Sequence, residues 1–264
     1  SGRPVAVAGV PPDYFNADGQ LWGNPLYDWD AMRSEGFGWW LARLAGQLAR
    51  FDLVRIDHFR ALESYWEIPY GAPTAREGVW RHGAGEVLLS VLRARLGELP
   101  LVAEDLGIIT DEVRALRDRF ALPGMVVLQF AFDGKPDNPH LPANHPENGV
   151  AYTGTHDNDT TLGWYAHLSE QQRGLVHSLL DAPPSAKAPD FLLDAAYGSR
   201  ARLAVVPLQD LLGLDSSSRM NVPGRADRNW RWRFQRGDLT PAIASRSLQR
   251  AQQHARLAWA GRGA

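Results

Sequence analysis

Residues 51–60 read Phe51-Asp-Leu-Val-Arg-Ile-Asp-His-Phe-Arg60, a short apolar run with charged residues at alternating positions. This length and alternation predict a β-strand that ends at Asp57. Because side chains alternate along a strand, Arg55 and Asp57 share one face. A strand inside an α/β protein would bury that pair, and a buried ion pair needs further partners. A purely structural salt bridge is the simple interpretation, so the rest of the chain must decide whether the pair has a chemical role.

The segments on either side alternate between helical and strand-like patterns. Apolar residues at helical spacing predict helices, and short apolar runs predict strands. Thr110, Ser169 and Thr240 are expected helix N-caps. The predicted helices include residues 38–50, 85–97 and 110–119, and the predicted strands include residues 51–57, 100–105, 124–132 and 201–208. About five strand–helix units in alternation predict an α/β fold with a parallel sheet and helices outside it.

Three carboxylates stand at the ends of apolar runs, namely Asp57, Glu104 and Asp157. The carboxyl ends of parallel strands share one edge of a sheet, so we expect the three to converge. The alternative for any one of them is a turn or helix cap. Converging carboxylates suit metal binding or attack at an acetal carbon. His58 and His156 directly adjoin an aspartate and would point the other way along a strand. We therefore favour glycoside chemistry, with no metal and no cofactor.

Residues 1–29 are rich in glycine, proline and asparagine, which favours an ordered loop with turns. They also carry large aromatic side chains, among them Tyr14 and Trp22, unlike a solvated linker. A loop this long and this aromatic is uncommon unless it binds a ligand or closes over a site. We expect an aromatic lid, and the alternative is an aromatic flap packed on the core.

Composition excludes several functions. The 264 residues carry a net charge of −2, so no basic face is expected for nucleic acid or for a membrane surface. The sequence contains no apolar run long enough to span a bilayer. The absence of cysteine excludes disulfides and fits a reducing compartment, so we expect the cytoplasm. Ten tryptophans exceed what a core of this size needs and are typical of sugar or peptide clefts.

Short motifs now carry a resemblance to a known family. Arg55-Ile-Asp57, Ala103-Glu104-Asp105 and Thr155-His156-Asp157-Asn-Asp159 resemble characteristic regions of the α-amylase clan. More narrowly, the chain resembles the 4-α-glucanotransferases (amylomaltases) of glycoside hydrolase family 77 from end to end. The motifs behind this narrower resemblance are Gly9-Val-Pro-Pro-Asp-Tyr-Phe15, Gly19-Gln-Leu-Trp-Gly-Asn-Pro25, Asp57-His-Phe-Arg60, Tyr65-Trp-Glu-Ile-Pro69, Val206-Pro-Leu-Gln-Asp-Leu-Leu-Gly213 and Asn229-Trp-Arg-Trp-Arg233.

The resemblance implies a (β/α)8 TIM-type barrel. The units in this chain correspond to about strands 4–8, so residues 1–264 are expected to form the carboxyl-terminal part of a longer catalytic barrel, with residues 1–29 as its lid. An open part-barrel would expose strand edges and lack part of the sugar site. One segment departs from the family pattern. In Gly78-Val-Trp-Arg-His-Gly-Ala-Gly85, Arg81 and Ala84 stand where the family is expected to have a lysine and a proline.

By the same resemblance Asp57 is the nucleophile, Glu104 the general acid/base and Asp157 the stabiliser of the transition state. Arg55 is expected to keep Asp57 ionised, and a neighbouring carboxylate such as Asp157 to raise the pKa of Glu104. The residues expected to bind substrate are Asp13, Tyr14, Gln20, Trp22, Arg55, His58 and His156.

The expected function is therefore a retaining 4-α-glucanotransferase that moves α-1,4-glucan segments between malto-oligosaccharides. Two alternatives stay open. A hydrolase of the α-amylase clan would share the three carboxylates, and an inactive glucan-binding fragment is possible because the upstream strands are expected to be missing. The sequence leaves the length of the donor and acceptor, linear or cyclic products, and the oligomeric state undecided.

Overall fold

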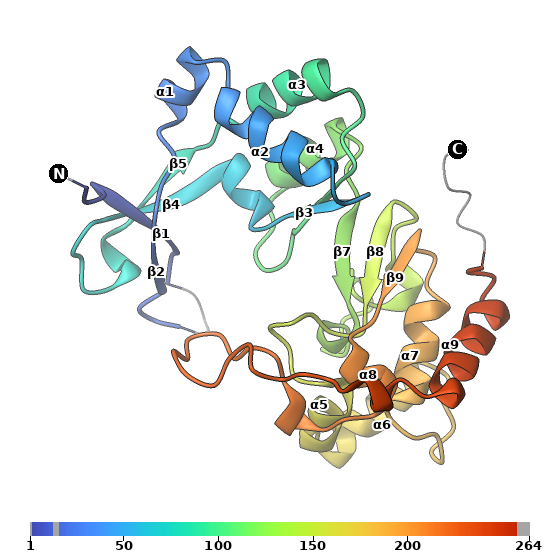
Figure 1. Ribbon diagram of the computed structural model, residues 1–264. Coiled ribbons are helices and arrows are strands. Elements are labelled where there is room, and N and C mark those ends of the chain that lie inside the picture. The colour runs from blue at the N-terminus through green and yellow to red at the C-terminus, as the bar shows by residue number, and fades with distance from the viewer. Residues whose placement is uncertain (1, 13–15, 258–264) are drawn as a thin grey trace. The chain divides into compact units, whose positions relative to one another are not determined.

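A computed structural model describes residues 2–12 and 16–257 of the chain. Strands and helices alternate along most of it, so the predicted α/β class is confirmed. The chain divides into two compact units, the first ending at Gly124 and the second starting at Met125. In Figure 1 the first unit runs from blue to green and the second from green to red. Each unit is described by itself below.

The first unit contains an antiparallel sheet with the strand order β2-β1-β4-β5. Its strands are β1 (Ala6–Val10), β2 (Gln20–Pro25), β4 (Ser64–Pro69) and β5 (Val79–His82). Val7 lies opposite Ile68, and both side chains are buried. At Gly9 a Cβ atom would collide with the carbonyl group of Gln20, so β1 and β2 approach closely only because this residue is glycine.

This sheet corrects the expectation of a loop over residues 1–29. β1 and β2 are both paired strands, joined through a segment that includes residues outside the described part of the chain. The local sequence favoured turns, but the pairing of β1 with β4 connects residues about sixty positions apart, and such non-local contacts override local propensity. The segment Gly78–Gly85, in which Arg81 and Ala84 depart from the family pattern, consists mainly of strand β5 and the start of helix α3.

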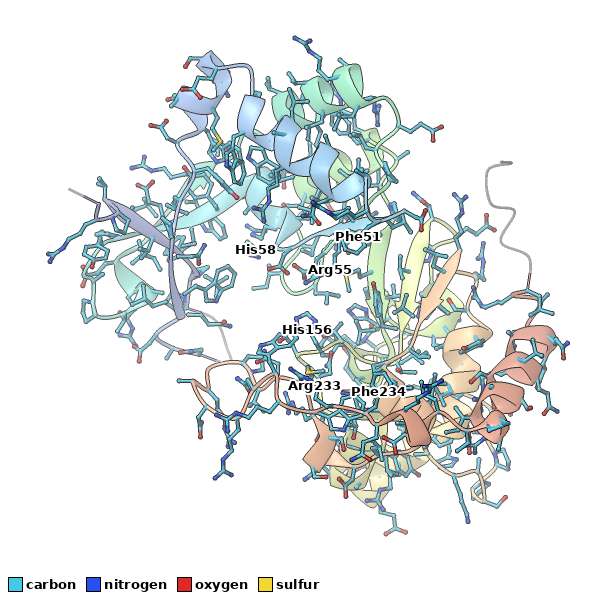
Figure 2. All side chains as sticks on the ribbon, viewed as in Figure 1. Phe51, Arg55, His58, His156, Arg233 and Phe234 are labelled. Atoms are coloured by element: carbon cyan, nitrogen blue, oxygen red, sulfur yellow. The ribbon has the colours of Figure 1, made fainter. Side chains whose placement is uncertain are left out.

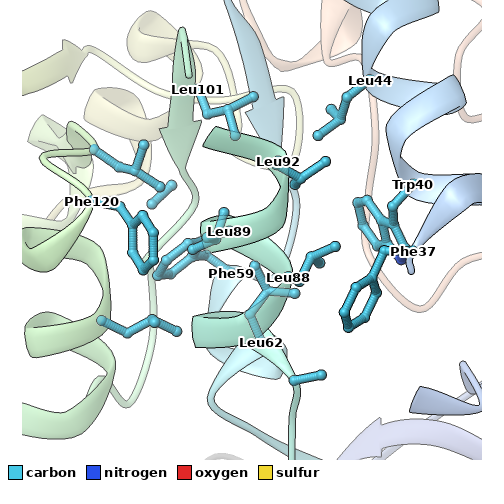
Figure 3. Packing of buried hydrophobic residues seen from close by; sticks show 14 of the residues in the cluster. Phe37, Trp40, Leu44, Phe59, Leu62, Leu88, Leu89, Leu92, Leu101 and Phe120 are labelled. Carbon is cyan, nitrogen blue, oxygen red and sulfur yellow. The ribbon is translucent and has the colours of Figure 1, made fainter. Parts of the chain in front are cut away.

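The other sheet of the first unit is the parallel pair β3 (Val54–Ile56) and β6 (Leu101–Ala103). Helices pack against it through a core that includes Leu44, Leu88 and Leu101. Figure 3 shows this core, with Phe59 beside Leu89 and Leu88. The helices of this unit are α1 (Trp29–Ser34), α2 (Gly38–Leu48), α3 (Gly85–Leu96), α4 (Asp111–Arg119) and the 3-10 turns η1 (Phe59–Leu62) and η2 (Ala75–Glu77). The predicted helices over 38–50, 85–97 and 110–119 are confirmed, because their apolar spacing is local.

The second unit contains a sheet with the order β7-β8-β9, drawn side by side in Figure 1. Its strands are β7 (Gly124–Val127), β8 (Gly149–Tyr152) and β9 (Leu203–Val205), and β8 pairs in parallel with β9. Helix α7 packs against β8 and β9. The helices are α5 (Thr161–His167), α6 (Glu170–Leu179), α7 (Asp190–Tyr197), α8 (Leu208–Leu212), α9 (Pro241–Gln253) and the 3-10 turns η3 (Leu128–Phe130), η4 (Pro142–Asn144), η5 (Ser216–Ser218) and η6 (Arg236–Asp238).

Local capping signals in this unit are confirmed, and two strand boundaries are corrected. Ser169 forms the expected capping box with Gln172, and the side chain of Thr240 accepts from the amide of Ile243. The strand predicted over 124–132 ends at Val127, because the chain turns into η3 there. The strand predicted over 201–208 is only the three-residue strand β9. Helix α8 begins at Leu208 and contains Asp210. Within the described part of the chain, no helix is long and apolar enough to cross a bilayer.

Candidate active site

Asp57 and Glu104 lie side by side at one edge of the first unit. Strands β3 and β6 run parallel, with Ile56 opposite Ala103, so each carboxylate is the first residue beyond its strand. The amide of Glu104 donates to the carbonyl oxygen of Ile56 at 3.0 Å, and the amide of Phe59 donates to the carbonyl oxygen of Glu104 at 3.0 Å. The parallel register therefore continues past the strand ends and brings the two side chains to the same edge, as the sequence predicted.

Two main-chain amides donate hydrogen bonds to the carboxylate of Glu104. Its Oε2 accepts from the amide of His58 at 2.7 Å, and its Oε1 accepts from the amide of Leu106 at 3.1 Å. Burial raises the pKa of Glu104 above its usual range, and the charge of Asp57 adds to that effect. The two amide donors and the charge of Arg55 act in the opposite direction. The raised pKa agrees with the expectation, but its first cause is burial, whereas the sequence argument had named a neighbouring carboxylate.

Asp57 is exposed and paired with Arg55. A guanidinium nitrogen of Arg55 donates to Oδ1 of Asp57 at 2.7 Å, so the two residues share a face as the alternation predicted. The expected burial is wrong, because the side chain of Asp57 is 80% exposed and that of Arg55 is 31% exposed. Asp57 is the first residue after the three-residue strand β3, and its side chain lies in solvent. Two carboxyl groups in contrasting surroundings thus stand next to each other, one exposed and ion-paired, the other partly buried.

His58 connects this pair to strand β2. Its backbone is left-handed, with φ 46° and ψ 53°, an uncommon conformation for a residue other than glycine. The ring of Trp22 meets the ring of His58 edge-on, with centroids 4.7 Å apart. Nε1 of Trp22 donates to Oε1 of Gln20 at 3.1 Å. Burial lowers the pKa of His58, so the ring favours its neutral form. Figure 2 labels His58 and Arg55 at the same edge of the first unit.

A second group of side chains lies near this edge, and the sequence did not predict the contacts among them. The guanidinium group of Arg60 lies 4.2 Å from the centroid of the Trp80 ring, and Trp80 meets Trp66 edge-on. Arg60 also donates to the carbonyl oxygen of Ile108 at 3.0 Å. On the neighbouring strand, Arg81 pairs with Glu67 at 3.1 Å. The motif residues of β4 and β5 therefore contact one another, a pairing that only the strand register discloses.

In the second unit, Asp157 lies in the loop between β8 and α5. Nδ2 of Asn221 donates to its Oδ1 at 2.6 Å, and Arg219 donates to its carbonyl oxygen at 2.6 Å. Nε2 of His156 is 3.4 Å from Oδ2 of Asp157. The two residues lie beyond the end of β8, so the expectation that they point in opposite directions along a strand does not apply. His156 is labelled in Figure 2.

The contacts of this loop also include residues that the sequence argument missed. The ring of Trp230 covers His156 at a centroid distance of 5.2 Å. Trp230 has a positive φ of 62°, and its amide donates to the carbonyl oxygen of Met220 at 2.7 Å. The motif containing Trp230 was recognised as a family feature, but its partner is more than seventy residues earlier in the chain. No motif or pattern in the sequence indicated that Asn221 or Arg219 would contact Asp157.

Comparison with known proteins places these motifs in a family. A family model described as 4-alpha-glucanotransferase, glycoside hydrolase family 77, matches residues 3–240. The chain belongs to this family. A 4-alpha-glucanotransferase of Thermus thermophilus is 52% identical over 97% of this chain and 53% of its own length. One from Synechocystis sp. is 51% identical over 89% of this chain and 47% of its own length.

A solved family structure resembles the chain closely. An amylomaltase from Streptococcus agalactiae in complex with acarbose matches with a TM-score of 0.92 and 35% identity, covering 96% of this chain and 52% of that one. The chain thus spans about half the length of the family members it matches.

Some site predictions for this family member stay untested. Asp13 and Tyr14 lie outside the described residues. Asp57 and Glu104 belong to the first unit and Asp157 to the second, so their convergence remains a prediction. Among the residues that the structure describes, no group of three or more histidine, cysteine or acidic side chains could hold a metal ion.

Proposed function

We propose that the chain carries catalytic residues of a retaining 4-α-glucanotransferase acting on malto-oligosaccharides and α-1,4-glucans. The observation that supports this most is the pair of adjacent carboxyl groups at the ends of β3 and β6. Asp57 is exposed and ion-paired with Arg55, whereas Glu104 is partly buried and has a raised pKa. A retaining mechanism needs one ionised carboxylate and one protonated carboxyl group, and contrasting surroundings are how a protein separates the two.

In the first step Asp57 attacks the anomeric carbon of the donor glucan. Glu104 gives its proton to the glycosidic oxygen, so the bond between sugar and leaving group breaks and a glycosyl ester forms on Asp57. In the second step the Glu104 carboxylate takes the proton of an acceptor hydroxyl group. That oxygen attacks the same carbon, and Asp57 leaves. Two displacements retain the anomeric configuration.

Other residues are proposed to hold the sugar. Asp157 stabilises the transition state in this proposal, and its contacts with Asn221 and His156 support a fixed orientation for it. Trp22, Gln20 and His58 bind substrate in the first unit, where their side chains are linked by contacts. Residues 1–29 act as a lid, and Asp13 and Tyr14 are assigned to it from the family resemblance alone. Arg55 both pairs with Asp57 and contacts substrate.

We further propose that the two units are parts of one (β/α)8 barrel, corresponding to about strands 4–8. The parallel pairs β3–β6 and β8–β9 support this, since parallel strands followed by helices are the repeating element of such barrels. The cytoplasm stays our proposed location.

Product analysis with maltotriose tests the function. Transfer produces glucose and longer chains with no net gain of reducing ends, whereas a hydrolase of the α-amylase clan produces reducing ends. The complete protein, with the additional length seen in its relatives, is assayed beside the present chain. Activity of the complete protein alone would assign the present chain to the inactive-fragment alternative. A gain of reducing ends as the main product would overturn the proposed transfer.

A further inference from the structure

Asp210 is a buried carboxylate to which the proposed mechanism assigns no role. It lies in helix α8 and is 1% exposed. No arginine, lysine or histidine lies within ion-pair distance of it in the described part of the chain. Burial raises its pKa, and its hydrogen bonds act in the opposite direction. Removing a carboxylate from water without a counter-ion costs free energy, so the burial of Asp210 needs a structural or functional reason.

In the described part of the chain, all the hydrogen bonds that the carboxylate of Asp210 accepts come from two threonines. Oδ2 accepts from the hydroxyl of Thr153 at 2.5 Å and from the hydroxyl of Thr161 at 2.6 Å. Oδ1 accepts from the amide of Thr161 at 2.7 Å. Both threonines are 1% exposed. Thr153 is the first residue after β8, and Thr161 is the first residue of α5. One carboxylate therefore joins the two ends of the loop formed by residues 154–160.

That loop carries His156 and Asp157. Other hydrogen bonds stabilise the interior of the loop. Oδ1 of Asn158 accepts from the hydroxyl of Thr155 at 2.9 Å. Oδ2 of Asp159 accepts from the hydroxyl of Ser216 at 2.6 Å. These bonds shape the loop, whereas the bonds to Asp210 fix where it begins and ends. A strand end and a helix start held to the same carboxylate cannot separate without leaving that carboxylate unpaired in the core.

We propose that Asp210 is a positioning residue that fixes the loop bearing Asp157 by binding Thr153 and Thr161 at its two ends. Its effect on catalysis rests on the proposed function, because it acts through Asp157. A group that contributes mainly in the transition state affects kcat more than KM when it is displaced. Loosening the loop should therefore lower kcat and leave KM nearly unchanged.

The threonines allow a test that does not remove the carboxylate, since Asp210→Asn can prevent folding. Thr153→Val and Thr161→Val keep the shape and lose the hydroxyl donor, whereas Thr153→Ser and Thr161→Ser keep the donor. Ser64→Ala is the matched control, because the hydroxyl of Ser64 donates to the carboxylate of Glu63 at 2.5 Å in the first unit. The variants are made in the complete protein and compared by amide hydrogen exchange and by kinetics with maltotriose.

Exchange at residues 154–160 is expected to rise about tenfold in the valine variants, the loss of one hydrogen bond to a charged group. kcat should fall about tenfold with KM unchanged, and the serine variants and Ser64→Ala should resemble wild type. Unchanged exchange in both valine variants would overturn the anchoring role. Faster exchange with unchanged kcat would overturn the positioning of Asp157. Faster exchange in the valine variants, combined with a complete wild-type protein that transfers no glucan, would support the anchor and refute the proposed function instead.

Discussion

The main-chain amide of His58 donates to Oε2 of Glu104 at 2.7 Å. At this hydrogen bond the backbone of His58 is left-handed, with φ 46° and ψ 53°. His58 directly follows Asp57, so the proposed nucleophile and the proposed acid/base are linked by one backbone hydrogen bond. Burial raises the pKa of Glu104, whereas this amide stabilises the carboxylate and lowers it. The backbone of His58 therefore tempers a pKa that burial alone would raise further.

This relationship predicts different pH profiles for His58→Asn and His58→Val. Both lose the imidazole, but asparagine tolerates the left-handed region and a β-branched residue does not. In His58→Val the amide is expected to turn away, so the pKa of Glu104 rises further and the acid stays protonated to higher pH. The basic limb of kcat/KM should then lie at higher pH in His58→Val than in His58→Asn. Arg55 and Asp57, the charged groups facing Glu104, are the same in both variants. Coinciding basic limbs would show that the amide does not tune Glu104.

Trp22→Ala is expected to shift the reaction from transfer toward hydrolysis. The indole lies on β2 and contacts the ring of His58, and acceptor sugars are proposed to stack there. Losing such an aromatic contact costs about 1–3 kcal/mol of acceptor binding, and about 1.4 kcal/mol is a factor of ten. The ratio of transferred to hydrolysed bonds from maltotriose should fall roughly tenfold.

Trp80→Ala is the matched control for that experiment. Trp80 is 44% exposed and Trp22 is 43% exposed in the same unit, but Trp80 packs against Arg60 and Trp66 instead. Its removal should leave the product ratio unchanged. If both variants slow both reactions equally, Trp22 only supports the strand and the lid proposal is wrong.

Two phenylalanines in one segment should differ in their effect on stability. Phe59 is 0% exposed in the core of the first unit, whereas Phe51 is 56% exposed. Phe59→Ala should lower the free energy of unfolding by about 3–5 kcal/mol because it leaves a cavity. Phe51→Ala should change it by no more than about 0.5 kcal/mol. Urea denaturation of the two variants checks this, and similar losses would mean that the core in Figure 3 is wrongly placed.

Exhaustive chelation should leave activity intact. The proposed displacement uses only carboxyl groups and sugar oxygens, and it requires no metal ion. The measurement is the transfer rate before and after dialysis against EDTA. A loss that one divalent cation restores would show that the strand-end carboxylates hold an ion.

The sequence predicted what local patterns determine. The helices over 38–50 and 85–97 follow from apolar spacing, and Ser169 and Thr240 act as caps within their own turns. The adjacency of Asp57 and Glu104 also followed, because parallel strands align their carboxyl ends. These features depend on residues that are close in sequence or on a general rule of sheet geometry.

Features that depend on distant residues were missed. The sequence predicts a loop where β1 and β2 lie, because the pairing of β1 with β4 joins residues far apart in the chain. Asn221 binds Asp157 across 64 positions, and Asp210 reaches Thr153 across 57. The exposure of Asp57 and the partial burial of Glu104 could not be predicted either, because burial depends on how far each strand extends and on which residues pack over its end.

The assignment of Asp57 as the nucleophile is tested most directly by trapping the covalent intermediate. The complete protein is incubated with a fluorinated glucosyl donor that slows the second displacement, then digested, and the labelled peptide is sequenced by mass spectrometry. Asp57→Ala is run in parallel and should take up no label while still binding glucan. The account predicts a single glycosyl label on Asp57 at the end of β3. A label on Glu104, Asp157 or any other residue would contradict it.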